Sequence, residues 1–253
     1  MSVKEINAEL YRNAKEDEIR RNFVEHFRKC PIPDNEILQN LGLFLSSKNL
    51  SRILFMDHIY RQIVDVQGVV MEFGTRWGPN ISLFAALRGI YEPFNRMRRI
   101  IGFDTFAGFP SISEKDNEEC ELIREGELKV TDDYVEYLER VMEYQEQDNP
   151  MSHVKKFELR VGDAIEQIDE YLDEHPETIV ALAYFDIDLY EPTKKCLEAI
   201  RPRLVKGSVV GFDELNDHDC PGETLALLEV FGLNNVRLKR YLYTSRTSYF
   251  VVE

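Results

Sequence analysis

The sequence has few of the features that mark secreted or membrane-bound proteins. Its four cysteines, Cys30, Cys120, Cys196 and Cys220, show no C-x-x-C spacing, which favours reduced thiols. No apolar run reaches the roughly 18 residues that a membrane span needs. The first residues are charged rather than a basic start followed by an apolar block, so no signal peptide is expected. We therefore expect a cytoplasmic protein that does not cross a membrane.

Basic charge is also scarce. The 253 residues carry 31 Lys and Arg against 46 Asp and Glu, a formal net charge of −15. Nucleic acids and anionic membrane surfaces both favour proteins with a basic face, so neither is an expected partner. Much of the excess lies between residues 111 and 149, where 14 acids face 4 basic residues. This segment is either a solvated face or a flap that recognises an acceptor molecule.

Residues 69–73 are apolar except for Glu72. This pattern is typical of a strand buried on both faces of a sheet. Gly74 and Gly78 follow it and bracket a tight turn, and Pro79 opens a helix. The missing β-carbons would let a ligand approach backbone N–H groups at the start of that helix. The stretch therefore predicts a nucleotide-type pocket.

The chain returns through a second strand at residues 99–103, and Asp104 stands just past its end, about 30 residues beyond Gly74. An acid at this place can accept hydrogen bonds from both hydroxyls of a ribose, in dinucleotide and in S-adenosylmethionine (SAM) sites alike. The turn reads G-x-x-x-G rather than G-x-G-x-x-G, so the glycine that a pyrophosphate needs is missing. This favours SAM. The alternative is an NAD(P)-dependent oxidoreductase, which also lacks a Tyr-x-x-x-Lys constellation here.

Strands and helices alternate through the rest of the chain, with further strands at residues 157–161, 180–187 and 208–212. Strands at 237–243 and 247–252 are joined by a link of hairpin length. The pattern predicts an α/β protein with a three-layer α/β/α sandwich, Rossmann-like, with a mostly parallel seven-stranded sheet that ends in an antiparallel hairpin.

The expected domain spans residues 67–253 and carries an acidic insert at about 111–151, with helices at 117–127 and 132–147. A helical extension, residues 1–66, precedes it, with helices at 3–28, 34–45 and 48–64 and Asp34 as a cap. The extension packs on the sheet or on a second subunit, or forms a lid over the acceptor pocket. A homo-oligomer is therefore expected.

Acids end two neighbouring buried strands: Asp186 and Asp188 after one, Asp213 and Glu214 after the other. The carboxyl ends of parallel strands meet at one edge of a sheet, where these like charges would repel unless something positive lay between them. Carboxylate oxygens suit Mg²⁺, Mn²⁺ or Ca²⁺. The sequence therefore predicts a divalent cation at this edge.

Two motifs, Glu72-Phe-Gly-Thr-Arg-Trp-Gly78 and Phe103-Asp-Thr-Phe-Ala-Gly-Phe-Pro110, resemble the macrocin O-methyltransferase family. The resemblance runs from about Gly68 to Leu215 and does not cover the first 60 residues. It implies the class I SAM methyltransferase fold, a divalent metal and a hydroxyl of a sugar or other natural product as methyl acceptor. It also implies an Asp-Asp pair, which reads Asp213-Glu214 here.

On these grounds Asp186, Asp213 and Glu214 are the expected metal ligands, and Asp188 or His218 the expected base. Asp163 either caps a helix or contacts adenine, and the two roles are compatible. A module that binds SAM without catalysis is a third interpretation, supported only by Glu214 in place of Asp. The residues expected around the cofactor are Glu72, Gly74, Thr75, Arg76, Gly78, Asn80, Asp104, Thr105, Phe106, Asp163, Ala164 and Asp186.

Overall fold

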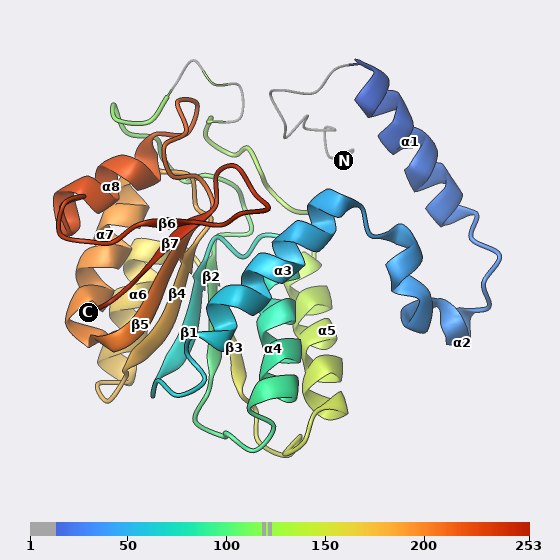
Figure 1. The fold of residues 1–253 in the computed structure, drawn as a ribbon, viewed down its shortest axis with the longest axis horizontal. Coiled ribbons are helices and arrows are strands. Elements are labelled where there is room, and N and C mark those ends of the chain that lie inside the picture. Colours follow the sequence, from blue (N-terminus) through green and yellow to red (C-terminus); the bar gives the residue numbers. More distant parts are fainter. Residues whose placement is uncertain (1–13, 118–119, 121–122) are drawn as a thin grey trace. The chain divides into compact units, whose positions relative to one another are not determined.

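The computed structural model describes residues 14–117, 120 and 123–253 (Figure 1). The chain divides into two compact units, residues 1–52 and 53–253. The helical pattern expected over residues 3–13 lies outside the described residues. Within the described ones, no helix combines the length and the hydropathy of a membrane span. The division expected at residues 66 and 67 concerns function and remains a prediction.

The first unit holds α1 (Ala14–Arg28), α2 (Asp34–Ile37), the 3-10 helix η1 (Leu38–Phe44) and the start of α3 (Ser47–Arg61). The Phe44 ring lies 4.8 Å from that of Phe27, centroid to centroid, and holds η1 against α1. The single helix expected over residues 34–45 is wrong, because Asn40 leaves helical geometry with φ −109°. Asp34 is not a cap either: Pro33 takes that position and no side chain caps the helix.

Seven strands form one sheet in the second unit, in the order β3-β2-β1-β4-β5-β7-β6. The first five are parallel, and β7 pairs antiparallel with both β5 and β6, so the predicted sheet with its terminal hairpin is confirmed. The strands are β1 (Val69–Phe73), β2 (Ile100–Asp104), β3 (Phe157–Val161), β4 (Val180–Phe185), β5 (Leu204–Phe212), β6 (Lys239–Arg240) and β7 (Ser248–Val251).

Helices cover both faces of this sheet (Figure 1). One core joins the sheet to α6, α7 and α8, and another joins it to α4, α5 and the second half of α3. This is the predicted three-layer arrangement. The further helices are α4 (Pro79–Tyr91), α5 (Tyr134–Asp148), α6 (Ala164–Glu174), α7 (Tyr190–Ile200), the short 3-10 helix η2 (Arg201–Arg203) and α8 (Gly222–Val230).

A row of phenylalanine rings supports the edge where the parallel strands end. Phe73 stacks on Phe103 at 4.9 Å and on Phe185 at 4.7 Å, and Phe185 stacks on Phe212 at 5.4 Å. All four side chains are buried. Because each ring belongs to the final residues of its strand, the row gives the loops beyond it a fixed base.

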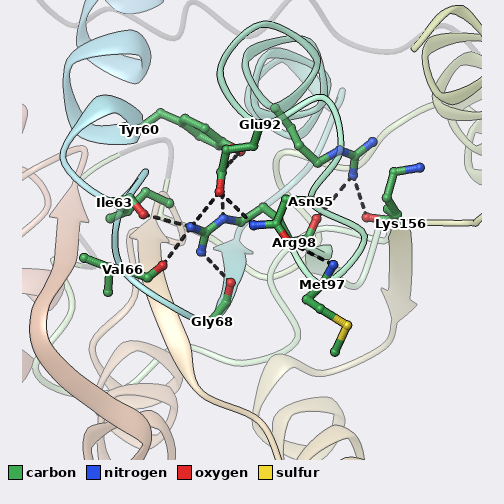
Figure 2. A network of polar contacts seen from close by, with 10 residues as sticks. Tyr60, Ile63, Val66, Gly68, Glu92, Asn95, Met97, Arg98 and Lys156 are labelled. Atoms are coloured by element: carbon green, nitrogen blue, oxygen red, sulfur yellow. Dashed lines mark hydrogen bonds and ion pairs between the residues drawn. The ribbon is translucent and has the colours of Figure 1, made fainter. Parts of the chain in front are cut away.

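Buried charges tie together the opposite edge, where the parallel strands begin (Figure 2). The Arg98 guanidinium donates to the backbone carbonyls of Ile63, Val66 and Gly68 and pairs with Glu92 at 2.8 Å. The Tyr60 hydroxyl donates to the same Glu92 carboxylate at 2.8 Å. Arg98 therefore fixes the link from α3 to β1 against the link from α4 to β2.

A second buried group lies beside it. Arg88 donates two hydrogen bonds to Glu146, at 2.8 and 3.0 Å, and one to the Lys156 carbonyl at 2.9 Å. The Lys156 ammonium pairs with Glu146 and donates to the carbonyls of Met151 and Val154. This group anchors α5, the helix of the acidic insert, to the core.

The rest of the insert departs from expectation. The helix expected over residues 117–127 is wrong for the described residues of that range, which form turns and a bridge between Phe109 and Glu125. Cys120 and Ile123 are buried against Phe109. Their apolar side chains thus serve packing over the sheet edge rather than one face of a helix.

Candidate active site

A cavity opens where the parallel strands end, the edge at which open α/β sheets bind their ligands. It lies over the ends of β2 and β4 and over the loops after β1 and β3. Seven of the residues predicted for the cofactor line it: Gly74, Arg76, Asp104, Thr105, Asp163, Ala164 and Asp186. The remaining ones, Glu72, Thr75, Gly78, Asn80 and Phe106, are not among its lining residues in the described part of the chain.

Asp104 is the last residue of β2, and two backbone amides fix its carboxylate. Arg76 N–H donates to Oδ2 at 2.7 Å and Phe106 N–H to Oδ1 at 2.6 Å. Both donors have left-handed backbones, with φ of 47° and 54°, a conformation that persists where surrounding structure enforces it. Burial raises the pKa of Asp104, and the two amides oppose the rise. The carboxylate is therefore held rigidly at the cavity.

The glycines of the first turn allow neighbouring parts of the chain to come close. A β-carbon on Gly74 would lie 1.9 Å from the Asp186 carbonyl oxygen, and one on Gly78 would lie 2.4 Å from the Leu138 side chain. Both have positive φ, 92° and 72°. The close approach of the β4 loop and of helix α5 thus requires glycine at both positions, and Gly74 also lines the cavity; that they open the backbone to a ligand stays a prediction.

Helix α5 also closes over the rest of this turn. The Tyr134 hydroxyl donates to the Trp77 carbonyl at 2.9 Å, and the two rings meet edge to face at 4.7 Å. Helix α5 thus docks at the turn that borders the cavity. The insert also contributes Leu128 to the cavity, while both interpretations of its acidic residues stay predictions.

Seven apolar residues that were not predicted for the cofactor also line the cavity: Phe103, Phe109, Pro110, Leu128, Ile187, Leu189 and Pro192. Phe106, for which stacking near adenine was considered, is instead buried in the core on the α4 side. Phe109 belongs to the second motif quoted above, so the motif marked the loop but not which ring faces the cavity. Leu128 lies in the insert, where the sequence offered no signal.

Asp163 caps α6, because its Oδ1 accepts a hydrogen bond from Ile165 N–H at 2.9 Å. Its proposed contact with adenine is compatible with this role, since the residue also lines the cavity. The Asp188 side chain does not cap α7, where Leu189 holds the cap position without a side-chain bond. Instead Asp116 in the insert accepts from Tyr190 N–H at 2.7 Å.

The acids after β4 and β5 come together as predicted from the topology. Asp213 and Glu214 are each 6% exposed. The Tyr184 hydroxyl donates to Asp213 Oδ1 at 2.8 Å, and Asn80 donates to Asp186 Oδ2 at 3.4 Å. Burial, together with neighbouring carboxylates, raises the pKa of Asp188 well above its usual value, and burial chiefly raises the pKa of Glu214.

Glu223, in the first turn of α8, is an acid of this cluster that the sequence analysis missed. It is fully buried, and its Oε2 accepts a hydrogen bond from Glu214 N–H at 3.2 Å. Burial and the four neighbouring acids raise its pKa well above the usual value. A β-carbon on the preceding Gly222 would lie 2.6 Å from the Asp188 carbonyl oxygen, so α8 presses directly on the β4 loop.

Arg246 supplies positive charge to the cluster. Its Nη1 lies 2.6 Å from Glu214 Oε1 and 3.2 Å from Asp217 Oδ2, and its Nη2 lies 3.9 Å from Asp213 Oδ2. The residue belongs to the link between β6 and β7. The sequence predicted something positive among these acids, and in this structure a side chain of the chain itself takes that position.

The donor atoms fit a hard cation. Glu214 Oε2 is buried and accepts no hydrogen bond from a nitrogen or oxygen atom of the described residues. Donor atoms of Asp188, Glu214 and Cys220 lie within 4.8 Å of one another. Burial raises the pKa of the Cys220 thiol, and a protonated thiol is a poor ligand for Mg²⁺. The carboxylates of Asp188 and Glu214 are therefore the candidate ligands in this group, which shares only Glu214 with the predicted set of Asp186, Asp213 and Glu214.

His218, the other candidate base, lies on an exposed turn. Its side chain is 95% exposed, and its Nδ1 is 3.5 Å from the Asp219 carboxylate. Asp188 lies at the cavity wall with φ 63°, in a turn closed by a hydrogen bond from Leu189 N–H to the Ile187 carbonyl at 2.7 Å. The geometry therefore favours Asp188 for chemistry inside the cavity.

No protein-family model and no curated protein matches the chain. Solved structures do. The calicheamicin methyltransferase CalS11 superposes with a TM-score of 0.93 at 41% sequence identity, covering 99% of this chain and 98% of the other. Its apo structure, described as a TDP-rhamnose 3'-O-methyltransferase, gives a TM-score of 0.84 at 40% identity over 98% and 99%.

The O-methyltransferase NovP is a more distant match. It superposes with a TM-score of 0.61 at 19% identity, covering 80% of this chain and 79% of the other. At this identity the likeness bears on the fold alone.

Proposed function

Since this chain belongs to the family of SAM-dependent O-methyltransferases that includes the calicheamicin enzyme, we propose that it methylates a sugar hydroxyl. The observation that carries the proposal is the 41% identity to that enzyme over nearly the whole chain. CalS11 is described as a TDP-rhamnose 3'-O-methyltransferase, so a nucleotide-linked sugar is the acceptor class that we favour. The finer resemblance to macrocin O-methyltransferases belongs to the same proposal. Membership in this family argues against the oxidoreductase alternative.

We infer that SAM occupies the cavity beside Asp104. The buried Nε of Arg76 has no hydrogen-bond partner within the described residues, which suits the carboxylate of the methionine part. Asp104 has its oxygens at the cavity wall and would accept from the ribose hydroxyls. Asp163 and the apolar side chains of Phe109 and Leu128 would surround the adenine.

A divalent cation, Mg²⁺ in the first place, would be held by Asp186, Asp213 and Glu214. The excess of carboxylates and the buried Glu214 Oε2 support this assignment. Bound there, the cation would orient the acceptor hydroxyl and lower its pKa.

Asp188 is the proposed base. The acceptor oxygen forms its bond to the methyl carbon while the carbon–sulfur bond breaks, and Asp188 takes the proton of the hydroxyl. Its position beside Asp186 at the cavity wall supports this role. The surrounding walls hold both reactants in line, which is where such enzymes gain much of their rate.

The role of the N-terminal extension and the cellular location of the enzyme stay predictions. We propose that the N-terminal helices serve as an oligomer contact or as a lid over the acceptor, and that the enzyme works in the cytoplasm. Several apolar side chains of α1 and η1 are exposed, among them Ile19, Phe27 and Leu38, which agrees with a contact to another surface.

Calorimetric titration of the metal-stripped protein with SAM and with NAD(H), repeated after adding Mg²⁺, tests the cofactor. We expect heat on adding SAM and none on adding NAD(H). Methyl transfer from labelled SAM to TDP-rhamnose and to free sugars then tests the acceptor. Tight SAM binding without transfer to any hydroxylated sugar would favour a module without catalysis.

A further inference from the structure

The proposed metal ligands already hold a cation, the guanidinium of Arg246. We propose that Arg246 and the divalent metal compete for Asp213 and Glu214, so that Arg246 neutralises the pair in the metal-free enzyme and must leave for the metal to bind. This inference rests on the proposed metal site and adds a residue that sets its affinity. Arg246 is thus a positioning residue and not a catalytic one.

The contacts of Arg246 make simultaneous binding unfavourable. Its Nη1 lies 2.6 Å from Glu214 Oε1 and its Nη2 3.9 Å from Asp213 Oδ2, so the guanidinium lies across both proposed ligands. A magnesium ion approaches its oxygen ligands to about 2.1 Å and orients them toward itself. Two cations between the same two carboxylates would repel each other in a site that is largely shielded from water.

The position of Arg246 also allows it to leave. It stands in the link between β6 and β7, and β6 is an edge strand of only two residues. Its side chain is 42% exposed, in contrast to the buried acids. Asp217, which Nη1 contacts at 3.2 Å and which is not a proposed metal ligand, stays available as its partner. Metal binding should therefore turn the guanidinium outward and shift the link.

The competition predicts that removing Arg246 tightens metal binding. Arg246→Met keeps much of the apolar stem and removes the charge. Arg246→Lys keeps a charge but replaces the planar fork by a compact ammonium. We expect the Met variant to bind Mn²⁺ about tenfold or more tightly than the wild type, the usual scale for coupling between two ligands, and the Lys variant to lie between them.

The test measures Mn²⁺ binding to the full, metal-stripped chain by electron paramagnetic resonance of free Mn²⁺. Thermal unfolding with and without Mn²⁺ gives a second readout without activity, and we expect the largest Mn²⁺-induced rise in Tm for Arg246→Met. Arg240→Met is the matched control, because Arg240 is an exposed arginine on β6 of the same hairpin.

Two other outcomes are distinguishable. Equal or weaker Mn²⁺ binding by Arg246→Met, with binding still lost in Asp213→Asn, would refute the competition and leave the metal site intact. Mn²⁺ binding that Asp213→Asn leaves unchanged would refute the metal site, and the competition with it. Tighter binding in Arg246→Met that Asp213→Asn abolishes is the result that the inference requires.

Discussion

At the edge of the sheet where the parallel strands begin, Arg98 meets Glu92 and three backbone carbonyls, and nearly every donor has an acceptor (Figure 2). At the edge where the strands end, Asp188, Glu214 and Glu223 lie close together, and their pKa values are raised. Both edges bury charge, which is costly unless the charge is paired. The difference agrees with a role of the first edge in stability and with the ligand site proposed at the second.

Helix direction contributes to this contrast. Arg88 is in the last turn of α4, at the edge where the strands begin, and Glu223 is in the first turn of α8, at the edge where they end. Cations are favoured near the carboxyl end of a helix and anions near its amino end. The helices that cover the sheet thus support opposite charges at its two edges, and substitutions at the two edges should have different consequences.

The largest expected effect on stability comes from Arg98→Met. The substitution leaves Glu92 buried beside Tyr60 and removes the donors to three carbonyls, so the free energy of unfolding should fall by about 3–5 kcal/mol. Urea unfolding followed by circular dichroism measures it. Arg96→Met, at an exposed position two residues earlier, is the control and should stay within about 0.5 kcal/mol of the wild type. Equal losses in both variants would contradict the role assigned to Arg98.

Asp213→Asn should affect activity strongly and stability little. Asn can still accept the hydrogen bond of the Tyr184 hydroxyl, so we expect unfolding to change by less than about 1 kcal/mol. Losing the charge of a metal ligand should lower kcat/KM for methyl transfer by about 100-fold or more, the usual scale for one lost electrostatic partner in a reaction site. Asp219→Asn in the same loop is the control. Unchanged turnover in Asp213→Asn would refute its assignment as a ligand.

The sequence predicted the elements that local patterns determine. Strands β1 and β3 begin and end as expected, because β1 is a short, mostly apolar run, β3 alternates apolar and charged residues, and a glycine follows each. The convergence of Asp186 and Asp213 also followed, since buried parallel strands must end at a common edge.

Long-range contacts could not be predicted in this way. Arg96 and Arg98 stand in one basic run, and nothing local tells the exposed one from the buried one. Arg246 reaches Glu214 from a hairpin link without a motif. The role of Gly74 depends on the Asp186 carbonyl, more than 100 residues away in the chain. These features depend on how the loops pack against one another. The spacing of residues in a single sequence does not reveal that packing.

Asp116 tests whether an acid near the second edge can nevertheless serve stability. Its carboxylate accepts hydrogen bonds from Tyr190 N–H, Ser113 N–H and the Ser113 hydroxyl, at 2.7, 2.9 and 2.8 Å. In Asp116→Asn one acceptor oxygen becomes a donor that faces these groups, so we expect a loss of about 1 kcal/mol by urea unfolding. Asp132→Asn, at an exposed position of the insert, should have no measurable effect. No loss in Asp116→Asn would mean that the insert does not depend on this cap.

The smallest expected effect is a gain in stability, from Glu223→Gln. Glu223 is fully buried among acids, and burial raises its pKa well above 4.5, so its folded form binds a proton where the unfolded chain has lost one. Stability therefore falls as pH rises from about 4.5 through the folded pKa. Gln is neutral at every pH and can still accept from Glu214 N–H, so Glu223→Gln should be more stable than the wild type by about 1 kcal/mol at pH 7.

Glu229 on the same helix provides the opposite case. Lys115, Tyr190 and Lys194 lower its pKa to about 2, so its ionised form contributes stability above pH 4.5 that is lost as pH falls toward 2. Glu229→Gln should therefore be less stable than the wild type near neutrality, and the difference should vanish in acid. Thermal unfolding of both variants between pH 2 and pH 8 measures the two slopes. Two slopes of the same sign would show that the environment of Glu223 is not dominated by its buried acidic neighbours.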